Sequence, residues 1–157
     1  MNKKGFTLIE LLVVIAIIGL LSTLAVVALG SAREKARDSK RLSDLKQTQT
    51  ALELYFTDEN EYPAGTALQL GGASAGCLGD TGFIASGCGA SAYMGQVPTG
   101  PNNSEYYLYT IGANSTTYTI TATLEGTMSG LDGAIEATPS GITDVSHKIT
   151  NFVSKII

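Results

Sequence analysis

A single acidic residue marks the first place in the sequence where side-chain chemistry is expected. Glu10 stands at the entrance of the apolar run Leu11–Leu29, and no further charged residue occurs before Arg33. A carboxylate in hydrocarbon costs about 2.5–3.5 kcal/mol on membrane-insertion scales, and acids at such positions are by default functional. Glu10 is therefore expected to have a role and to need a partner.

The two cysteines are the second candidate for chemistry. Cys77 and Cys88 lie in a Gly-rich stretch, and an even number of cysteines in an exported chain suggests a disulfide. The alternative is two unpaired small residues in a loop. A metal site is not expected, because the single histidine, His147, is far away in sequence and the usual spacing of paired zinc ligands is missing.

Neither an enzyme nor a nucleic-acid-binding protein is indicated. The sequence has one histidine, no acids with a clear mutual placement and no phosphate-binding glycine motif, since no Lys-Ser/Thr follows Gly71-Gly72. No cofactor is implied. Residues 47–147 contain ten Asp and Glu but no Lys or Arg, which argues against contacts with nucleic-acid phosphates.

The apolar run has the length of a membrane span. Its nineteen residues, Leu11–Leu29, form a helix of about 28 Å, close to the hydrocarbon thickness of a bilayer. Six basic residues follow within residues 33–46, so the positive-inside rule alone favours a cytoplasmic C-terminal side. The cysteines and the acidic remainder of the chain suit an exported domain instead.

Three interpretations compete for the N-terminus. A cleaved secretory signal does not explain the length of the run or the presence of Glu10, and a plain membrane anchor explains only the length. The third rests on Lys4-Gly5-Phe6-Thr7-Leu8-Ile9-Glu10 followed directly by the apolar run. This segment resembles the N-terminal signature of bacterial type IV prepilins and type II secretion pseudopilins.

The resemblance implies a specific fate for the N-terminus. In that family a membrane peptidase cuts after the residue that matches Gly5 and methylates the new amino terminus, here Phe6. The residue that matches Glu10 is the characteristic acid of the family. Gly5 has no side chain to hinder a protease, and the amine of Phe6, with an ordinary pKa of about 7.7–8, is a cation that Glu10 of a neighbouring subunit could meet. Such a contact would set the register of a filament.

The segment after the span has a helical pattern. Residues 31–60 contain good helix formers and no proline. Leu42, Leu45, Leu52 and Phe56 recur near the helical period, and Ala32 and Ala36 are expected to extend this apolar stripe. The opposite face is expected to carry the charged residues. They are Glu34, Asp38, Lys40, Asp44 and Lys46. A head domain must cover the stripe, and bending at Gly19 or Gly30 is expected in a filament.

The remainder is expected to form a small head. Residues 64–103 are rich in Gly and Ser and predict a long loop closed by Cys77–Cys88. Alternation predicts strands at Tyr106–Ile111 and Thr117–Leu124, with a third near Ala134–Thr138. The tail, Ile142–Ile157, has apolar residues at helical spacing, which favours an amphipathic helix, although its β-branched residues leave a strand open.

The expected fold is α+β and pilin-like, with a long N-terminal helix packed against a small antiparallel sheet. The expected segments are a leader at 1–5, a transmembrane and filament-core helix at 6–30, an amphipathic helix at 31–60 and a head at 61–157. The predicted function is that of a pilin or pseudopilin; the alternative is a membrane-tethered binding module that does not polymerise. The implied partners are further copies of the chain, prepilin peptidase, an inner-membrane assembly platform and, before assembly, membrane lipid. The implied location is the inner membrane, as a single-pass precursor with its head outside the cytoplasm, and then a periplasmic or cell-surface filament.

Overall fold

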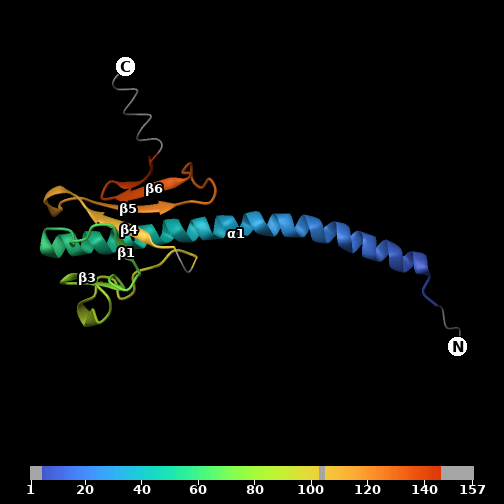
Figure 1. Ribbon diagram of the computed structural model, residues 1–157, viewed down its shortest axis with the longest axis horizontal. Coiled ribbons are helices and arrows are strands. Elements are labelled where there is room, and N and C mark those ends of the chain that lie inside the picture. Colours follow the sequence, from blue (N-terminus) through green and yellow to red (C-terminus); the bar gives the residue numbers. More distant parts are fainter. Residues whose placement is uncertain (1–4, 103–104, 146–157) are drawn as a thin grey trace, which may run out of the picture.

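The computed structural model describes residues 5–102 and 105–145. Its dominant element is α1, Leu8–Glu59, a helix of 52 residues that is about 78 Å long. Figure 1 shows that the C-terminal part of the helix runs along the head and that the other part extends bare. The helix ends at Asn60, which adopts the left-handed conformation that often terminates helices (φ 60°). The single long helix expected from the sequence is confirmed.

The head contains a five-stranded antiparallel sheet in the order β1-β4-β5-β6-β7. The strands are β1 (Leu68–Leu70), β4 (Tyr107–Ile111), β5 (Tyr118–Thr123), β6 (Ala134–Thr138) and β7 (Gly141–Asp144). Strand β5 is central, with Ile120 opposite Tyr109 on β4 and opposite Ala137 on β6. The three strands predicted from alternation are confirmed within one residue at each end.

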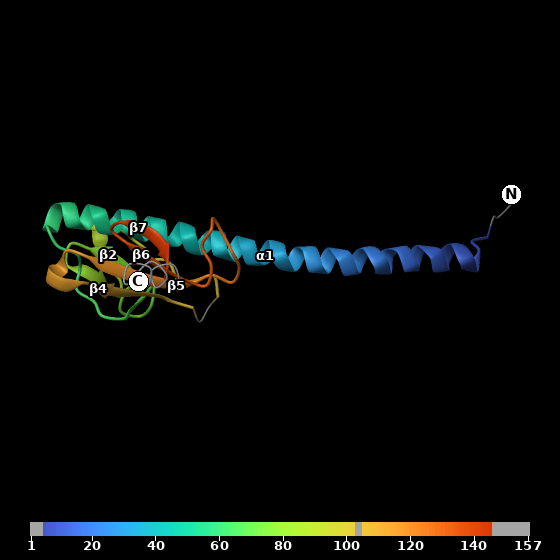
Figure 2. The ribbon, with the colours of Figure 1, turned by 90° about the horizontal axis from the view of Figure 1, so that it is seen from above.

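One face of this sheet packs on α1, and Figure 2 shows the helix running along it. The alternating side chains that face the helix are buried, with Tyr109, Ile120 and Ile135 completely so. Leu45 and Leu52 of α1 meet them with no exposed surface. The head thus covers the helix stripe, as expected for an α+β fold.

The stripe differs from its prediction at the end nearer the apolar run. Ala32 and Ala36 are exposed, whereas Asp38, Arg41 and Asp44 are buried. The assignment of Asp38 and Asp44 to the solvent face is therefore wrong. The physical reason is that Arg41 neutralises acids at this position. Ion-paired side chains, and not Ala32 and Ala36, therefore extend the buried face of α1 toward the apolar run.

Residues 64–103 also differ from the predicted loop. They contain β1, which joins the main sheet, and a separate hairpin of β2 (Cys77–Gly79) and β3 (Gly82–Ile84). A short 3₁₀ turn follows at Gly89–Ser91. Each of these strands has only three residues, too few for alternation to distinguish them from loop.

The tail begins as a strand, so a helix starting at Ile142 is wrong. Ile142 lies in β7 opposite Ala137 of β6, and its β-branched side chain suits that position. Most of the predicted amphipathic segment, residues 146–157, lies outside the described residues.

Candidate assembly site

The N-terminus of α1 holds Glu10 in a capping box. Thr7 is the N-cap, and its hydroxyl accepts a hydrogen bond from the Glu10 backbone N–H at 3.3 Å. The Glu10 carboxylate in turn accepts from the Thr7 backbone N–H at 2.8 Å and from the Thr7 hydroxyl at 2.5 Å. In a single copy of the chain, Glu10 is therefore satisfied by its own helix end, a role that sequence reasoning did not assign to it.

Gly5 and Phe6 lie just before the helix, where the backbone is neither helix nor strand. A side chain added at Gly5 would meet no atom within 4 Å, and Phe6 is 81% exposed. The Gly5–Phe6 peptide bond is thus open to an approaching protein. The structure places it one residue before the capping box.

The helix turns after Glu10 present apolar side chains to the outside on every face. The large side chains from Leu8 to Leu29 keep 47–81% of their surface exposed. In the described residues, α1 is the one helix that is long and apolar enough to cross a membrane. This surface requires lipid or another apolar partner.

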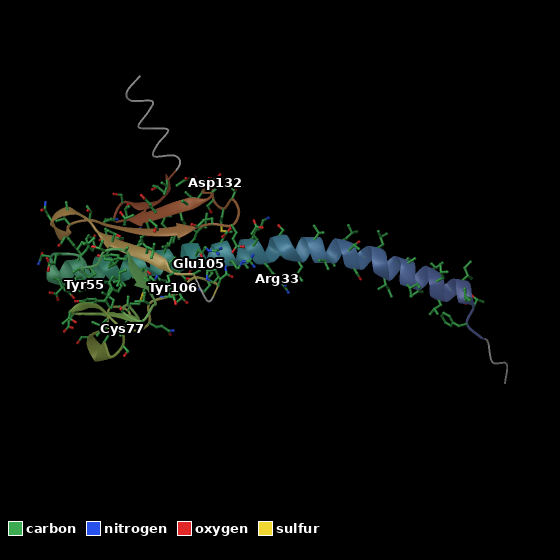
Figure 3. All side chains as sticks on the ribbon, viewed as in Figure 1. Arg33, Tyr55, Cys77, Glu105, Tyr106 and Asp132 are labelled. Carbon is green, nitrogen blue, oxygen red and sulfur yellow. A yellow bond between two sulfur atoms is a disulfide. The ribbon has the colours of Figure 1, made fainter. Side chains whose placement is uncertain are left out.

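The other half of α1 is joined to the head by Arg41, whose side chain is 2% exposed. Its guanidinium binds Asp38 at 2.7 Å, Glu105 at 2.7 and 2.8 Å, and Glu125 at 2.7 Å. Arg37 forms a second ion pair with Glu125. Figure 3 shows Glu105 beside α1, where the head begins. We call these five residues the Arg41 cluster.

Asp38 extends the Arg41 cluster to the backbone of the β5–β6 loop. Its carboxylate accepts hydrogen bonds from the N–H groups of Glu125 and Gly126 at 3.0 and 2.9 Å. A Cβ at Gly126 would lie 2.2 Å from the Glu34 carboxylate, so a larger residue there would displace the flexible Glu34 side chain. The loop is therefore fixed to α1 by both charge and backbone hydrogen bonds.

A second polar contact lies one turn further along α1. Asp44 accepts from the Lys40 ammonium at 2.6 Å and from the buried Tyr107 hydroxyl at 2.8 Å. Lys40 also donates to the Thr99 carbonyl at 2.7 Å. Three of the six cations that follow the apolar run, Arg37, Lys40 and Arg41, thus have carboxylate partners within the folded chain, which gives them a structural role.

The electrostatics of the Arg41 cluster favour the charged forms. Hydrogen bonds from Arg37 and Arg41 lower the pKa of Glu125 to about 2, and Arg41 lowers the pKa of Glu105. Hydrogen bonds from Glu105, Glu125 and Asp38 raise the pKa of Arg41. The lining of an adjoining groove of about 640 Å³ includes Arg37, Arg41, Glu105 and Glu125 together with Tyr106, Leu108 and Thr121. The cluster can hold the stem and head together across the neutral pH range.

Cys77 and Cys88 form the predicted disulfide. It joins β2 to the segment that follows β3, and Cys77 is buried. Two aromatic contacts attach this lobe to the rest of the molecule. They are Phe83 with Tyr109, at 5.0 Å between ring centroids, and Tyr93 with Tyr55, at 5.4 Å. The disulfide thus shapes a lobe that packs on both the sheet and the helix.

Metal binding and catalysis receive no assignment from the described side chains. Among residues 5–102 and 105–145, no group of three or more His, Cys, Asp or Glu is placed to hold a metal ion. Asp38, Glu105 and Glu125 belong to the Arg41 cluster, where guanidinium groups bind them. This arrangement binds the head to the helix and leaves the N-terminal half of α1 uncovered.

Comparisons with known proteins point to one kind of N-terminus. Residues 1–30 match the model of the prokaryotic N-terminal methylation motif. The type II secretion system core protein G of Pectobacterium carotovorum is 44% identical over 63 residues, which is 40% of each chain. The corresponding protein of Escherichia coli is 44% identical over 62 residues, or 40% of this chain and 43% of its own. The type IV wide pilus major component PilA4 of Thermus thermophilus is 42% identical over 66 residues, or 42% of this chain and 50% of its own.

These matches are partial. The aligned stretch spans less than half the length of the secretion proteins, and no solved structure is a significant match. The head is therefore described from its own structure. The resemblance read from Lys4–Glu10 is nevertheless confirmed: the chain carries a prepilin-type N-terminal methylation motif and is similar to type II secretion pseudopilins and type IV pilins.

Proposed function

We propose that this protein is a structural subunit, a pilin or pseudopilin, of a filament of the type IV pilus or type II secretion kind, assembled through α1 after removal of its leader. The observation that carries the proposal is the apolar half of α1, which extends bare from the head and begins with the methylation motif (Figure 1). Before assembly this surface is covered by lipid, and in the filament other subunits cover it.

Processing takes place at the exposed Gly5–Phe6 junction. A prepilin peptidase removes residues 1–5 and methylates the amine of Phe6, which keeps its positive charge. Gly5 and Phe6 lie outside any helix or strand, and a Cβ added at Gly5 would meet no atom within 4 Å. This exposure supports cleavage there, because a protease needs access to the backbone on both sides of the bond.

Assembly then changes the partner of Glu10. In the single chain its carboxylate is bound by Thr7. The processed Phe6 of a neighbouring subunit brings a full positive charge into a low-dielectric environment, where it attracts a carboxylate more strongly than a neutral N–H or hydroxyl does. Desolvation offsets part of this gain. The capping box thus keeps Glu10 satisfied until the neighbour arrives.

The proposed location follows from the same features. The precursor crosses the inner membrane once, with the head outside the cytoplasm, where a disulfide such as Cys77–Cys88 is stable. An inner-membrane assembly platform extracts the processed subunit into the filament. A tethered binding module is the weaker alternative, because a tether has no use for Glu10 or for a methylation motif.

The test is to produce the full chain in a bacterium that supplies a prepilin peptidase and an assembly platform. Sheared material is then examined by immunoblotting and electron microscopy. The proposal predicts filaments that contain the processed chain. Processed protein that stays entirely in the membrane fraction, while a known pilin assembles in the same host, would contradict it and favour the tether.

A further inference from the structure

The five-stranded sheet has an outer face that α1 does not cover, since the helix runs along the other face (Figure 2). Side chains alternate between the two faces along β4. Tyr107 and Tyr109 are buried on the helix side, whereas Tyr106 and Leu108 lie on the outer side and are 37% and 39% exposed. Beyond the apolar run, the one other large apolar side chain in the described residues with comparable exposure is Leu54 of α1. Tyr106 and Leu108 thus form an apolar patch on the outer face.

The groove of about 640 Å³ joins this patch to the Arg41 cluster. Besides Tyr106 and Leu108, its lining includes Thr121 of β5, Ala134 of β6, and Glu105 and Glu125 of the cluster. Figure 3 shows Tyr106 next to Glu105. The cluster contains three carboxylates and two guanidinium groups, so its net charge is negative. The groove therefore suits an apolar segment that also carries cations.

The chain leaves the sheet at the same end as the groove. Asp144, the last residue of β7, lies opposite Ile135 of β6, and the residue before Ile135 is Ala134, which lines the groove. Neighbouring strands are about 4.8 Å apart, so β4 lies about 14 Å from β7 across the sheet. Residues 146–157 follow directly and lie outside the described residues. Twelve residues span about 18 Å as a helix and more when extended, which is enough to reach β4.

The amino-acid sequence of residues 146–157 has the two properties that the groove requires. Its apolar residues recur at helical spacing. They are Ile149, Phe152, Val153 and Ile156. The segment contains no Asp or Glu, and its Lys148 and Lys155 are the first Lys or Arg residues after Lys46. Residues 47–147 contain ten Asp and Glu, so the C-terminal segment has the opposite charge to the head that precedes it.

We propose that residues 146–157 fold back within the same chain and cover this groove. Phe152 and the apolar residues beside it pack on Tyr106 and Leu108, while the two lysines add positive charge next to the Arg41 cluster. The C-terminal segment then closes the outer face of the sheet, as α1 closes the inner face. This inference goes beyond the proposed function, because it concerns a single subunit and holds whether or not that subunit enters a filament.

Cysteine cross-linking in the full-length chain tests the contact directly. The variant Thr121→Cys/Val153→Cys keeps Phe152 and the apolar patch; it is purified in detergent with the Cys77–Cys88 disulfide intact and oxidised at low protein concentration. A disulfide between positions 121 and 153 within one chain, identified by peptide mapping, is the expected result. The matched control is Thr57→Cys/Val153→Cys, because Thr57 is an exposed threonine of α1, which packs on the other face of the sheet. Equal cross-linking of the control, no cross-link in the test pair, or cross-links only between two chains would each overturn the proposal.

Hydroxyl-radical footprinting of the full-length chain provides the second measurement. Phe152→Asp should raise the oxidation of Tyr106 and Leu108 at least about threefold, because the loss of one buried aromatic ring weakens docking about tenfold. Asn151→Asp introduces the same charge between the apolar positions and should leave the oxidation of both residues unchanged. Leu54 serves as the internal reference, since it is 53% exposed on α1. Equal oxidation of Tyr106 and Leu108 in the wild type and in Phe152→Asp, relative to Leu54, would overturn the proposal.

Discussion

The two halves of α1 are similar in length but have opposite relations to the rest of the chain. From Leu8 to Leu29 the large side chains are exposed on all faces, and this part of the helix projects away from the head (Figure 1). From Asp38 to Tyr55 eight side chains are buried, three of them charged. One half finds its partners within the chain, whereas the other needs partners from outside.

This difference teaches that the two halves should fail in different ways. A change in the apolar half or at its N-terminus alters processing or assembly but leaves the head folded, because no described head residue packs there. A change at a buried side chain of the polar half destabilises the head. Variants that separate these two outcomes test the division.

The largest effect is expected at the processing junction. Gly5→Leu adds a side chain where the peptidase must approach the backbone, so the leader should remain attached and filaments should be lost. Immunoblotting should find only the longer form in the membrane fraction, with the Cys77–Cys88 disulfide formed. Protein of normal mature size from this variant would contradict the assignment of Gly5.

Glu10→Ala should block assembly after processing. It removes a membrane-buried carboxylate, so insertion should be at least as good as in the wild type, yet filaments should be few because the amine of a neighbouring Phe6 loses its partner. The structure adds a control, since Glu10→Ala also removes the carboxylate half of the capping box, while the Thr7 hydroxyl still caps the helix. Thr7→Val weakens the same box and keeps the acid.

Electron microscopy of the two variants decides between the acid and the cap. We expect near-normal filaments from Thr7→Val and few or none from Glu10→Ala, with both chains processed. Equal loss from both would assign the defect to the helix cap. A Glu10→Ala chain that is cleaved and makes filaments of normal number and length would refute the register role of Glu10.

Arg41→Ala changes the polar half of α1 and should destabilise the head. It leaves Asp38 buried without its cation and removes one ion pair each from Glu105 and Glu125. Loss of one partner from a buried ion pair costs about 3–5 kcal/mol, and we expect the lower end because Glu105 and Glu125 are 24% and 31% exposed. Thermal unfolding in detergent measures the change.

The matched control for that variant is Arg37→Ala. Its ion pair with Glu125 is about one-third exposed on both sides, so the loss of stability should be much smaller than for Arg41→Ala. Processing at Gly5 should be normal in both variants. An Arg41→Ala head as stable as the wild type would show that the cluster does not hold the stem and head together.

The smallest effect on processing and assembly is expected for the disulfide. Cys88→Ser opens a loop with a sequence separation of 11, which corresponds to about 3 kcal/mol at most in the chain-entropy model. The aromatic contacts of the lobe remain, so processing and assembly should continue with a lower melting temperature. Thiol labelling of the native wild-type chain should find neither cysteine free; full labelling without reductant would contradict the bond.

The sequence predicted the parts of the fold that repeat along the chain. Alternation in Thr117–Leu124 gave β5 because one face of that strand is apolar and the other is threonine. The apolar run and the signature before it predicted the N-terminal site, because the residues of that site are continuous in sequence. Short strands such as β2 and β3 carry too few residues for either period to appear.

The Arg41 cluster was missed for a different reason. Glu105 and Glu125 lie 64 and 84 residues from Arg41 in the sequence, and no local pattern connects them with it. One signal was present: residues 38, 41, 45, 48, 52 and 55 recur at helical spacing and mix charges with Leu45 and Leu52. A stripe in which charged residues continue an apolar series indicates a buried ion-pair network on the same helix face.

The mass of the mature N-terminus tests the central claim most directly. Protein purified from the membrane and from sheared filaments is digested, and its first peptide is sequenced by mass spectrometry. We expect the chain to begin at N-methylated Phe6 in both fractions. A chain that begins near Ser31 would indicate a cleaved secretory signal, and an intact Met1 would indicate a membrane anchor; either result would contradict the account.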